Sequence, residues 1–128
     1  MRRALILLVC TAALAAIAGC GESDQEQARE VVQDYVDARG AEDYARICEL
    51  YSDDFKEELN VDDCEAFVRE QTSGGEGNGE EDLNIVDVRV RDDRAIAEID
   101  VVRGDQGPSR IGLVLTRDGD DWRISGLQ

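Results

Sequence analysis

The chain has 128 residues, with 30 acidic and 14 basic side chains and no histidine, and its formal net charge is −16. A protein this acidic repels phosphate backbones, which excludes nucleic acid as a partner class. The missing histidine removes the commonest general base and the commonest metal ligand. We therefore expect no metal and no cofactor.

The N-terminal segment has the pattern of a bacterial lipoprotein export signal. Two arginines precede an apolar run from Ala4 to Ala18, which is shorter than the about 20 residues of a membrane-spanning helix. The run ends in the sequence IAGC at residues 17–20, which is a lipobox. We predict that residues 1–19 are a signal peptide and that Cys20 carries a diacylglycerol. The alternative is an ordinary secretion signal or an uncleaved anchor, with Cys20 only a small apolar residue.

The lipobox also predicts a location. A diacylglycerol on Cys20 would anchor the protein in the cell membrane on its extracytoplasmic face, because two acyl chains give lasting attachment. Residues 20–23 then form a short tether, which at about 3.5 Å per residue holds the next segment within roughly 10 Å of the headgroups. The 109 residues after the signal carry 12 basic and 30 acidic side chains, a net charge of −18. They are enough for one domain, predicted at residues 24–128.

The first predicted helix runs from Asp24 to Arg39. Ser23 and Glu26 stand at capping-box spacing before it, and Gly40 follows its last turn. Its apolar positions recur on one helical face, at Ala28, Val31, Val32, Tyr35 and Val36.

A second helix is predicted at residues 41–51 and a third at residues 62–71, with a short turn around Phe55 and Leu59 between them. Asp62 and Glu65 repeat the capping-box spacing before the third helix. Together with the first helix, these segments make three predicted N-terminal helices.

Two cysteines, Cys48 and Cys64, remain in an oxidising compartment and fall on the apolar faces of the second and third helices. We expect a disulfide between them, which would stabilise the domain by about 3 kcal/mol through closure of its loop. The alternatives are two buried thiols or a redox-active pair, although the spacing is unlike that of redox or zinc motifs.

The C-terminal half has the period of a β-sheet. Residues 72–82 contain four glycines and predict a flexible loop, and from Leu83 onward apolar and polar residues alternate in four segments separated by turns. The pattern predicts a curved four-stranded antiparallel meander with three helices on its apolar face, an α+β fold. Asp118, Asp120 and Asp121 lack the spacing of a calcium loop, so we interpret them as a hairpin turn rather than a metal site.

These elements, with the cysteine pair and the terminal sequence GDDWRI at residues 119–124, together resemble the nuclear transport factor 2-like superfamily. The segment EDYA at residues 42–45, with the side chains that follow it, is similar to small lipoproteins of that superfamily; these side chains are Cys48, Leu50, Tyr51, Ser52 and Phe55. The resemblance implies a cone-like arrangement of helices on the sheet. It transfers no chemistry, since isomerases, cyclases, dehydratases and noncatalytic modules share this scaffold.

Similar enzymes pair an Asp or His base with a Tyr donor. The residues that this resemblance nominates are Tyr35, Tyr44 or Tyr51 with Asp100 or Glu98. Both acids alternate with apolar residues of their strand, so they are expected to face away from the core. We therefore predict no catalytic residue.

The functional prediction is a membrane-anchored extracytoplasmic lipoprotein that binds a small apolar or cationic ligand or a cell-envelope protein. Two alternatives stay open. One is a small tethered enzyme of isomerase or cyclase type with a carboxylate base, and the other is a purely structural interaction domain filled by its own side chains.

Overall fold

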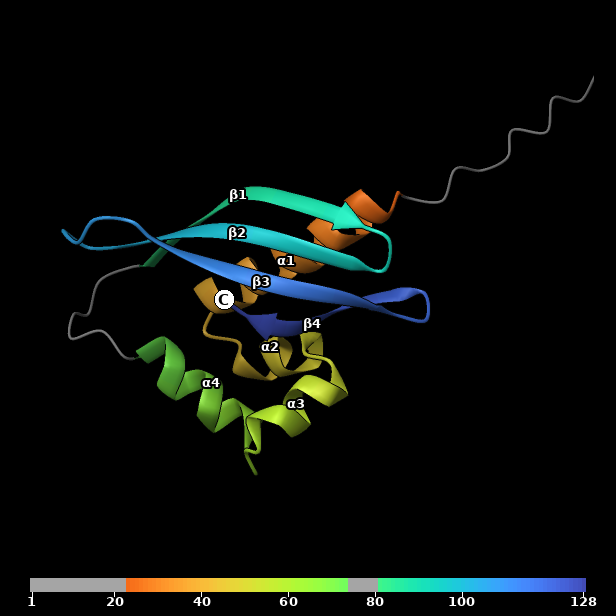
Figure 1. Ribbon diagram of the computed structural model, residues 1–128. Helices are drawn as coiled ribbons and strands as arrows, with labels where there is room; N and C mark the ends of the chain where they lie inside the picture. Colours follow the sequence, from red (N-terminus) through yellow and green to blue (C-terminus); the bar gives the residue numbers. More distant parts are fainter. Residues whose placement is uncertain (1–22, 74–80) are drawn as a thin grey trace, which may run out of the picture.

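A computed structural model describes residues 23–73 and 81–128 (Figure 1). The signal peptide, Cys20, most of the tether and most of the glycine-rich loop lie outside the described residues. Within them the order of elements is four helices followed by four strands: α1 Asp24–Gly40, α2 Tyr44–Leu50, α3 Asp53–Leu59, α4 Cys64–Ser73, β1 Glu81–Arg91, β2 Arg94–Arg103, β3 Ser109–Asp118 and β4 Asp121–Leu127.

The four strands form one antiparallel sheet in the order β1-β2-β3-β4, which confirms the predicted meander. A bulge between Ile85 and Asp87 of β1 shifts the register against β2. Helix α1 packs on one face of the sheet, called here the inner face, whereas α2, α3 and α4 lie beyond β4 (Figure 1). The fold is therefore α+β.

The capping box predicted for α1 is confirmed. The Ser23 hydroxyl accepts a hydrogen bond from the Glu26 backbone N–H, and the Glu26 carboxylate accepts one from the Ser23 N–H at 3.0 Å. These bonds satisfy backbone donors that have no partner within the helix. The sequence therefore fixes the start of α1 locally.

The predicted number of three helices is wrong, because the described residues contain four. The segment predicted as a short turn is helix α3. Its start is capped by the Ser52 hydroxyl, which accepts from the Phe55 N–H at 3.1 Å, and it ends at Asn60 in the left-handed conformation. A polar cap and a left-handed stop are enough to define a helix of seven residues.

Two further boundaries differ from the prediction. The second helix covers only Tyr44–Leu50, because Glu42 has a positive φ of 56° and Tyr51 is extended. The cap of α4 is Asp63, whose carboxylate accepts from the Ala66 N–H at 3.1 Å, and not Asp62. Local backbone geometry therefore shortened the second predicted helix, and the helix predicted at residues 62–71 lies at Cys64–Ser73 instead.

The inner face of the sheet is covered by apolar side chains. Ala97 and Ile99 of β2 and Leu115 of β3 are completely buried, and α1 contributes Ala28 and Val32 with no exposed area. Burying a side chain of this kind stabilises the fold by about 1.5–3 kcal/mol. The period-two pattern is thereby confirmed for β2, whereas in β1 the bulge leaves Val86, an apolar position of the pattern, 43% exposed.

The predicted disulfide joins Cys48 of α2 to Cys64 of α4. It ties α4, which packs mainly on α2, to the rest of the domain. Among the described residues, no helix has the length and apolar character needed to cross a membrane.

Candidate functional site

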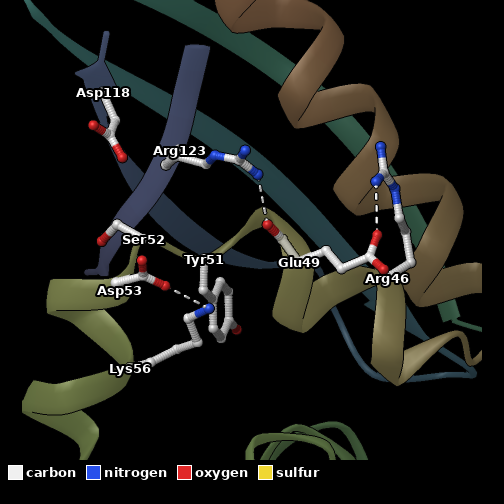
Figure 2. A pocket seen from close by; sticks show the side chains of 8 residues that line it. All are labelled: Arg46, Glu49, Tyr51, Ser52, Asp53, Lys56, Asp118 and Arg123. Atoms are coloured by element: carbon white, nitrogen blue, oxygen red, sulfur yellow. Dashed lines mark hydrogen bonds and ion pairs between the residues drawn. The ribbon is translucent and has the colours of Figure 1, made fainter.

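A cleft of about 420 Å³ opens between α2, α3 and the β3–β4 hairpin, and we call it the polar cleft (Figure 2). Every residue that lines it is charged or carries a hydroxyl: Arg46, Glu49, Tyr51, Ser52, Asp53, Lys56, Asp118 and Arg123. Its volume falls within the range of about 300–1,000 Å³ found for small-molecule sites.

Backbone pairing assembles the polar cleft from distant parts of the chain. Residues 51–52 link α2 to α3 in an extended conformation, and Tyr51 forms a parallel bridge with Ile124 of β4. The Ser52 N–H donates to the Ile124 carbonyl at 2.8 Å. This pairing places the two helices beside Arg123, the neighbour of Ile124 in β4.

Four of the six charged side chains in the polar cleft are neutralised in pairs. Arg46 lies 2.9 Å from Glu49 and 2.8 Å from Asp34, and Lys56 lies 2.9 Å from Asp53. The hydrogen bond from Lys56 lowers the pKa of the Asp53 carboxyl. Such exposed pairs contribute little to stability. The Asp53 carboxylate is also a poor general base, because its lowered pKa means that it holds a proton weakly.

The other two charged side chains are less constrained. The Asp118 carboxylate has no hydrogen-bond or ion-pair partner among the described residues. Arg123 donates from Nη1 to the Glu49 carbonyl at 2.7 Å, but its Nη2 is 3.8 Å from the Asp121 carboxylate, beyond hydrogen-bond distance. The polar cleft therefore offers one free carboxylate and a guanidinium with unused donors.

The two hydroxyls of the polar cleft are not activated for chemistry. Tyr51 is only 4% exposed and packs edge-on against the Phe55 ring. Burial, with a further contribution from nearby Tyr35, raises the Tyr51 pKa well above its usual value, so its hydroxyl stays protonated. The Ser52 hydroxyl caps α3 and has no basic side chain paired with it. Neither group is an activated nucleophile.

The other two nominated tyrosines each contact an arginine side chain. Tyr35 is buried in α1, and its hydroxyl accepts a hydrogen bond from Arg39 at 3.1 Å. Arg39 also pairs with Glu81 at 2.8 Å. Tyr44 in α2 lies under the Arg69 guanidinium, 5.1 Å from the ring centre. These contacts give each tyrosine a structural role.

Glu98 and Asp100 lie on the outer face of the sheet, as the strand pattern predicted. The Asp100 carboxylate pairs with Arg110 at 2.8 Å, and this hydrogen bond lowers its pKa. Glu98 pairs with Arg89 at 3.2 Å. The nominated acids thus point away from the buried tyrosines, and no tyrosine–carboxylate dyad of the nominated residues is formed.

The predicted hairpin turn at Asp118–Asp121 is confirmed, with Gly119 at a positive φ of 64°. Glycine adopts this conformation without the steric cost that a side chain would add. Within residues 23–73 and 81–128, no three His, Cys, Asp or Glu side chains are grouped so that they could hold a metal ion.

The polar cleft was not predicted. Glu49 and Lys56 belong to no predicted motif, Arg123 lies in the GDDWRI sequence that predicted only a fold, and the three residues come from three elements. The sequence signals near it predicted a short turn around Phe55 and Leu59 and a hairpin turn at Asp118, and neither predicted a site.

No protein-family model matches the sequence, and no curated protein matches it. Solved structures do match its fold. A Thiobacillus denitrificans protein described as a calcium/calmodulin-dependent protein kinase type II association domain is 15% identical, with a TM-score of 0.58 over 78% of this chain and 90% of that one. A nuclear transport factor 2-like protein of Shewanella baltica is 13% identical, with a TM-score of 0.58 over 80% and 88% of the two chains.

A third match is a Kribbella flavida protein described as a ketosteroid isomerase. It is 16% identical, and the superposition has a TM-score of 0.53 over 82% of this chain and 77% of that one. At these identities the likeness concerns the fold, which is known to carry many unrelated activities.

Proposed function

Because this chain has the nuclear transport factor 2-like fold, we propose that it is a noncatalytic binding module, anchored by a lipid on Cys20 to the extracytoplasmic face of the cell membrane. The fold supplies a rigid frame, and the lipobox at residues 17–20 supports the anchor. The membrane, a small ligand and a cell-envelope protein are the proposed partners.

The polar cleft carries the binding part of this proposal. It combines a ligand-sized volume with paired charges, a protonated tyrosine and a serine used as a helix cap. General acid–base catalysis needs a group whose pKa lies near the working pH, within reach of the reacting atom. The polar cleft has hydrogen-bonding groups of both charges but no activated base, which supports binding over catalysis.

The test of binding is native mass spectrometry of the protein extracted from its own membranes, followed by a denaturing mass of the same sample. We expect a mass in the native spectrum that is lost on denaturation. It should also be lost from an Arg123→Ala variant and kept in an Arg110→Ala variant, which changes an arginine on the outer face. A native mass equal to the denatured mass would contradict tight ligand binding.

The denaturing mass also tests the anchor. The wild-type protein should lack residues 1–19 and carry the mass of a diacylglycerol, whereas Cys20→Ser should lack that lipid and leave the membrane fraction. An unlipidated wild-type mass, or unchanged fractionation of the lipid-free variant, would refute the lipobox interpretation.

One observation favours a second candidate, the purely structural interaction domain. The inner face, where a cone-like scaffold would hold its ligand, is filled by the chain's own apolar side chains. A binding partner would then be a protein on the outside of the domain. Cross-linking in intact cells would identify it, and a protein adduct without any small-ligand mass would favour this candidate.

A further inference from the structure

The polar cleft lies at the end of the domain where α1 begins. Arg117 of β3 forms an ion pair with Asp24, the first residue of α1, and the next residue along β3 is Asp118, which lines the polar cleft. Gln25 also donates to the Val88 carbonyl of β1. Figure 1 shows the start of α1 at the same end of the sheet as the β3–β4 turn.

This placement puts the polar cleft near the proposed lipid anchor. Only four peptide units separate Cys20 from Asp24, a reach of roughly 14 Å at full extension. Asp24 pairs with Arg117, so the start of α1 and the β3–β4 turn lie at the same end of the sheet, although the side chains of Arg117 and Asp118 point to opposite faces of β3. The hairpin side of the polar cleft therefore lies at the end of the domain that a lipid on Cys20 would hold near the headgroup layer.

The groups left free in the polar cleft specify a ligand with two opposite charges. The Asp118 carboxylate is unpartnered, and Arg123 keeps donors that make no bond to the described residues. A primary ammonium has three donors for a carboxylate, and a guanidinium matches the oxygens of a phosphate. Arg46 and Lys56 already have acidic partners, so the polar cleft has little attraction for an anion alone.

We propose that the polar cleft binds the phosphoethanolamine headgroup of phosphatidylethanolamine in the membrane that carries the anchor, with the ammonium on Asp118 and the phosphate on Arg123. This inference rests on the lipid anchor of the proposed function. The net charge of −18 after signal removal opposes contact with anionic lipids, whereas a zwitterionic headgroup has no net charge to be repelled.

The contact is testable because the headgroup amine is the only primary amine in a bilayer of phosphatidylethanolamine and phosphatidylcholine. The lipidated mature protein would be reconstituted in nanodiscs of these two lipids and treated with a zero-length carbodiimide. The reagent joins a carboxylate to an amine as an amide, with loss of one water taken up by the reagent. Peptide mass spectrometry then locates the lipid-bearing carboxylate.

We expect the amide on Asp118 to exceed that on Asp120 by about tenfold, the effect of one charge-assisted contact. Asp120 is the matched control, since it is exposed in the same turn but does not line the polar cleft. Equal yields at the two carboxylates would overturn the proposal, because they would reflect mere closeness to the membrane.

Variants of Arg123 show whether the headgroup is bound by this guanidinium or is attracted only by the overall charge of the protein. Arg123→Ala should lower the Asp118 amide about tenfold, Arg123→Lys should retain part of it, and Arg110→Ala on the outer face should leave it unchanged. Melting temperatures of all variants verify folding. An Arg123→Ala yield equal to that of wild type, in a folded protein, would also overturn the proposal.

A second arm distinguishes the membrane from a soluble source of the same chemistry. Free phosphoethanolamine would be offered to the protein in nanodiscs of phosphatidylcholine alone. Labelling of Asp118 by the soluble compound but not by the lipid would overturn the membrane headgroup as ligand. A retained ligand of another mass in the native spectrum would also overturn the phosphatidylethanolamine proposal, but the protein would still be a binding module. The lipid anchor is tested separately, by the diacylglycerol mass and the fractionation of Cys20→Ser.

Discussion

The inner face of the sheet and the polar cleft share the β3–β4 hairpin, but the inner face is lined by buried apolar side chains and the polar cleft mostly by charged ones. Leu115 of β3 and Ile124 of β4 have no exposed area, and the inner face they help form is apolar. Arg123, beside Ile124 in the same strand, reaches the polar cleft, where four of the six charged side chains are paired with each other. The inner face therefore carries stability, whereas the polar cleft is free to carry recognition.

The largest effect is expected from a cavity in the inner face. Leu115→Ala should lower the free energy of unfolding by about 2–5 kcal/mol, because the buried side chain leaves a space that the sheet cannot close. Urea denaturation measures the change. Val86→Ala, at a side chain that is 43% exposed, is the control and should change stability by under about 0.5 kcal/mol. Similar values for both would show that the inner face contributes no more to stability than an exposed position of the sheet.

The disulfide should give the next largest effect. Cys48→Ser frees α4 from α2 and should cost about 3 kcal/mol under nonreducing conditions, through the larger conformational freedom of the unfolded chain. Reduction of the wild-type protein should bring its melting temperature down to that of the variant. Identical melting of oxidised wild type and variant would show that the bond adds nothing.

Tyr51 lies where the two regions meet, and it should make stability depend on alkaline pH. Its pKa is raised in the folded state, while in the unfolded chain it is about 10. The unfolded chain therefore loses the proton first, so the stability contributed by burial is complete below about pH 10 and falls as the pH rises above it. Tyr51→Phe should flatten the fall in melting temperature between pH 9 and pH 11, roughly the range around that value. An unchanged slope would show that Tyr51 is accessible in the folded state.

The smallest effect is expected inside the polar cleft. Lys56→Met should raise the Asp53 pKa back toward its usual value, because the hydrogen bond that lowers it is lost. In the wild type, the lowered Asp53 pKa stabilises the folded state at pH values above the pKa that Asp53 has in the unfolded chain. This stabilisation is lost as the pH falls through the pKa that Asp53 has in the folded state. Asp53 is fully exposed, so melting at neutral pH should hardly change. NMR titration of the Asp53 side chain measures this pKa. A large loss of stability in Lys56→Met would show that the Lys56–Asp53 pair stabilises the fold.

What the sequence could predict was set by local chemistry. The capping box of Ser23 and Glu26 and the alternation in β2 depend on residues a few positions apart, and the structure confirms both. Helix α3 was predicted only as a short turn, because its seven residues show too few apolar repeats. Tyr51 was placed on a helical face by spacing, but its pairing with Ile124 holds it extended.

The polar cleft could not be predicted because its geometry comes from tertiary pairing. Glu49, Lys56 and Arg123 meet only when residues 51–52 align with β4, and no spacing in the sequence records that contact. By contrast, the positions of Glu98 and Asp100 could be predicted from the sequence. The strand pattern alone predicted that Glu98 and Asp100 face outward, and the structure places both on the outer face.

The backbone bond between Ser52 and Ile124 has a consequence for the order of folding. It joins the middle of the chain to its last strand, so the entropy of closing this long loop must be overcome before the contact forms. Until β4 is available, the link between α2 and α3 has no strand to pair with. A chain synthesised from its N-terminus therefore cannot complete this topology until its final strand has left the ribosome.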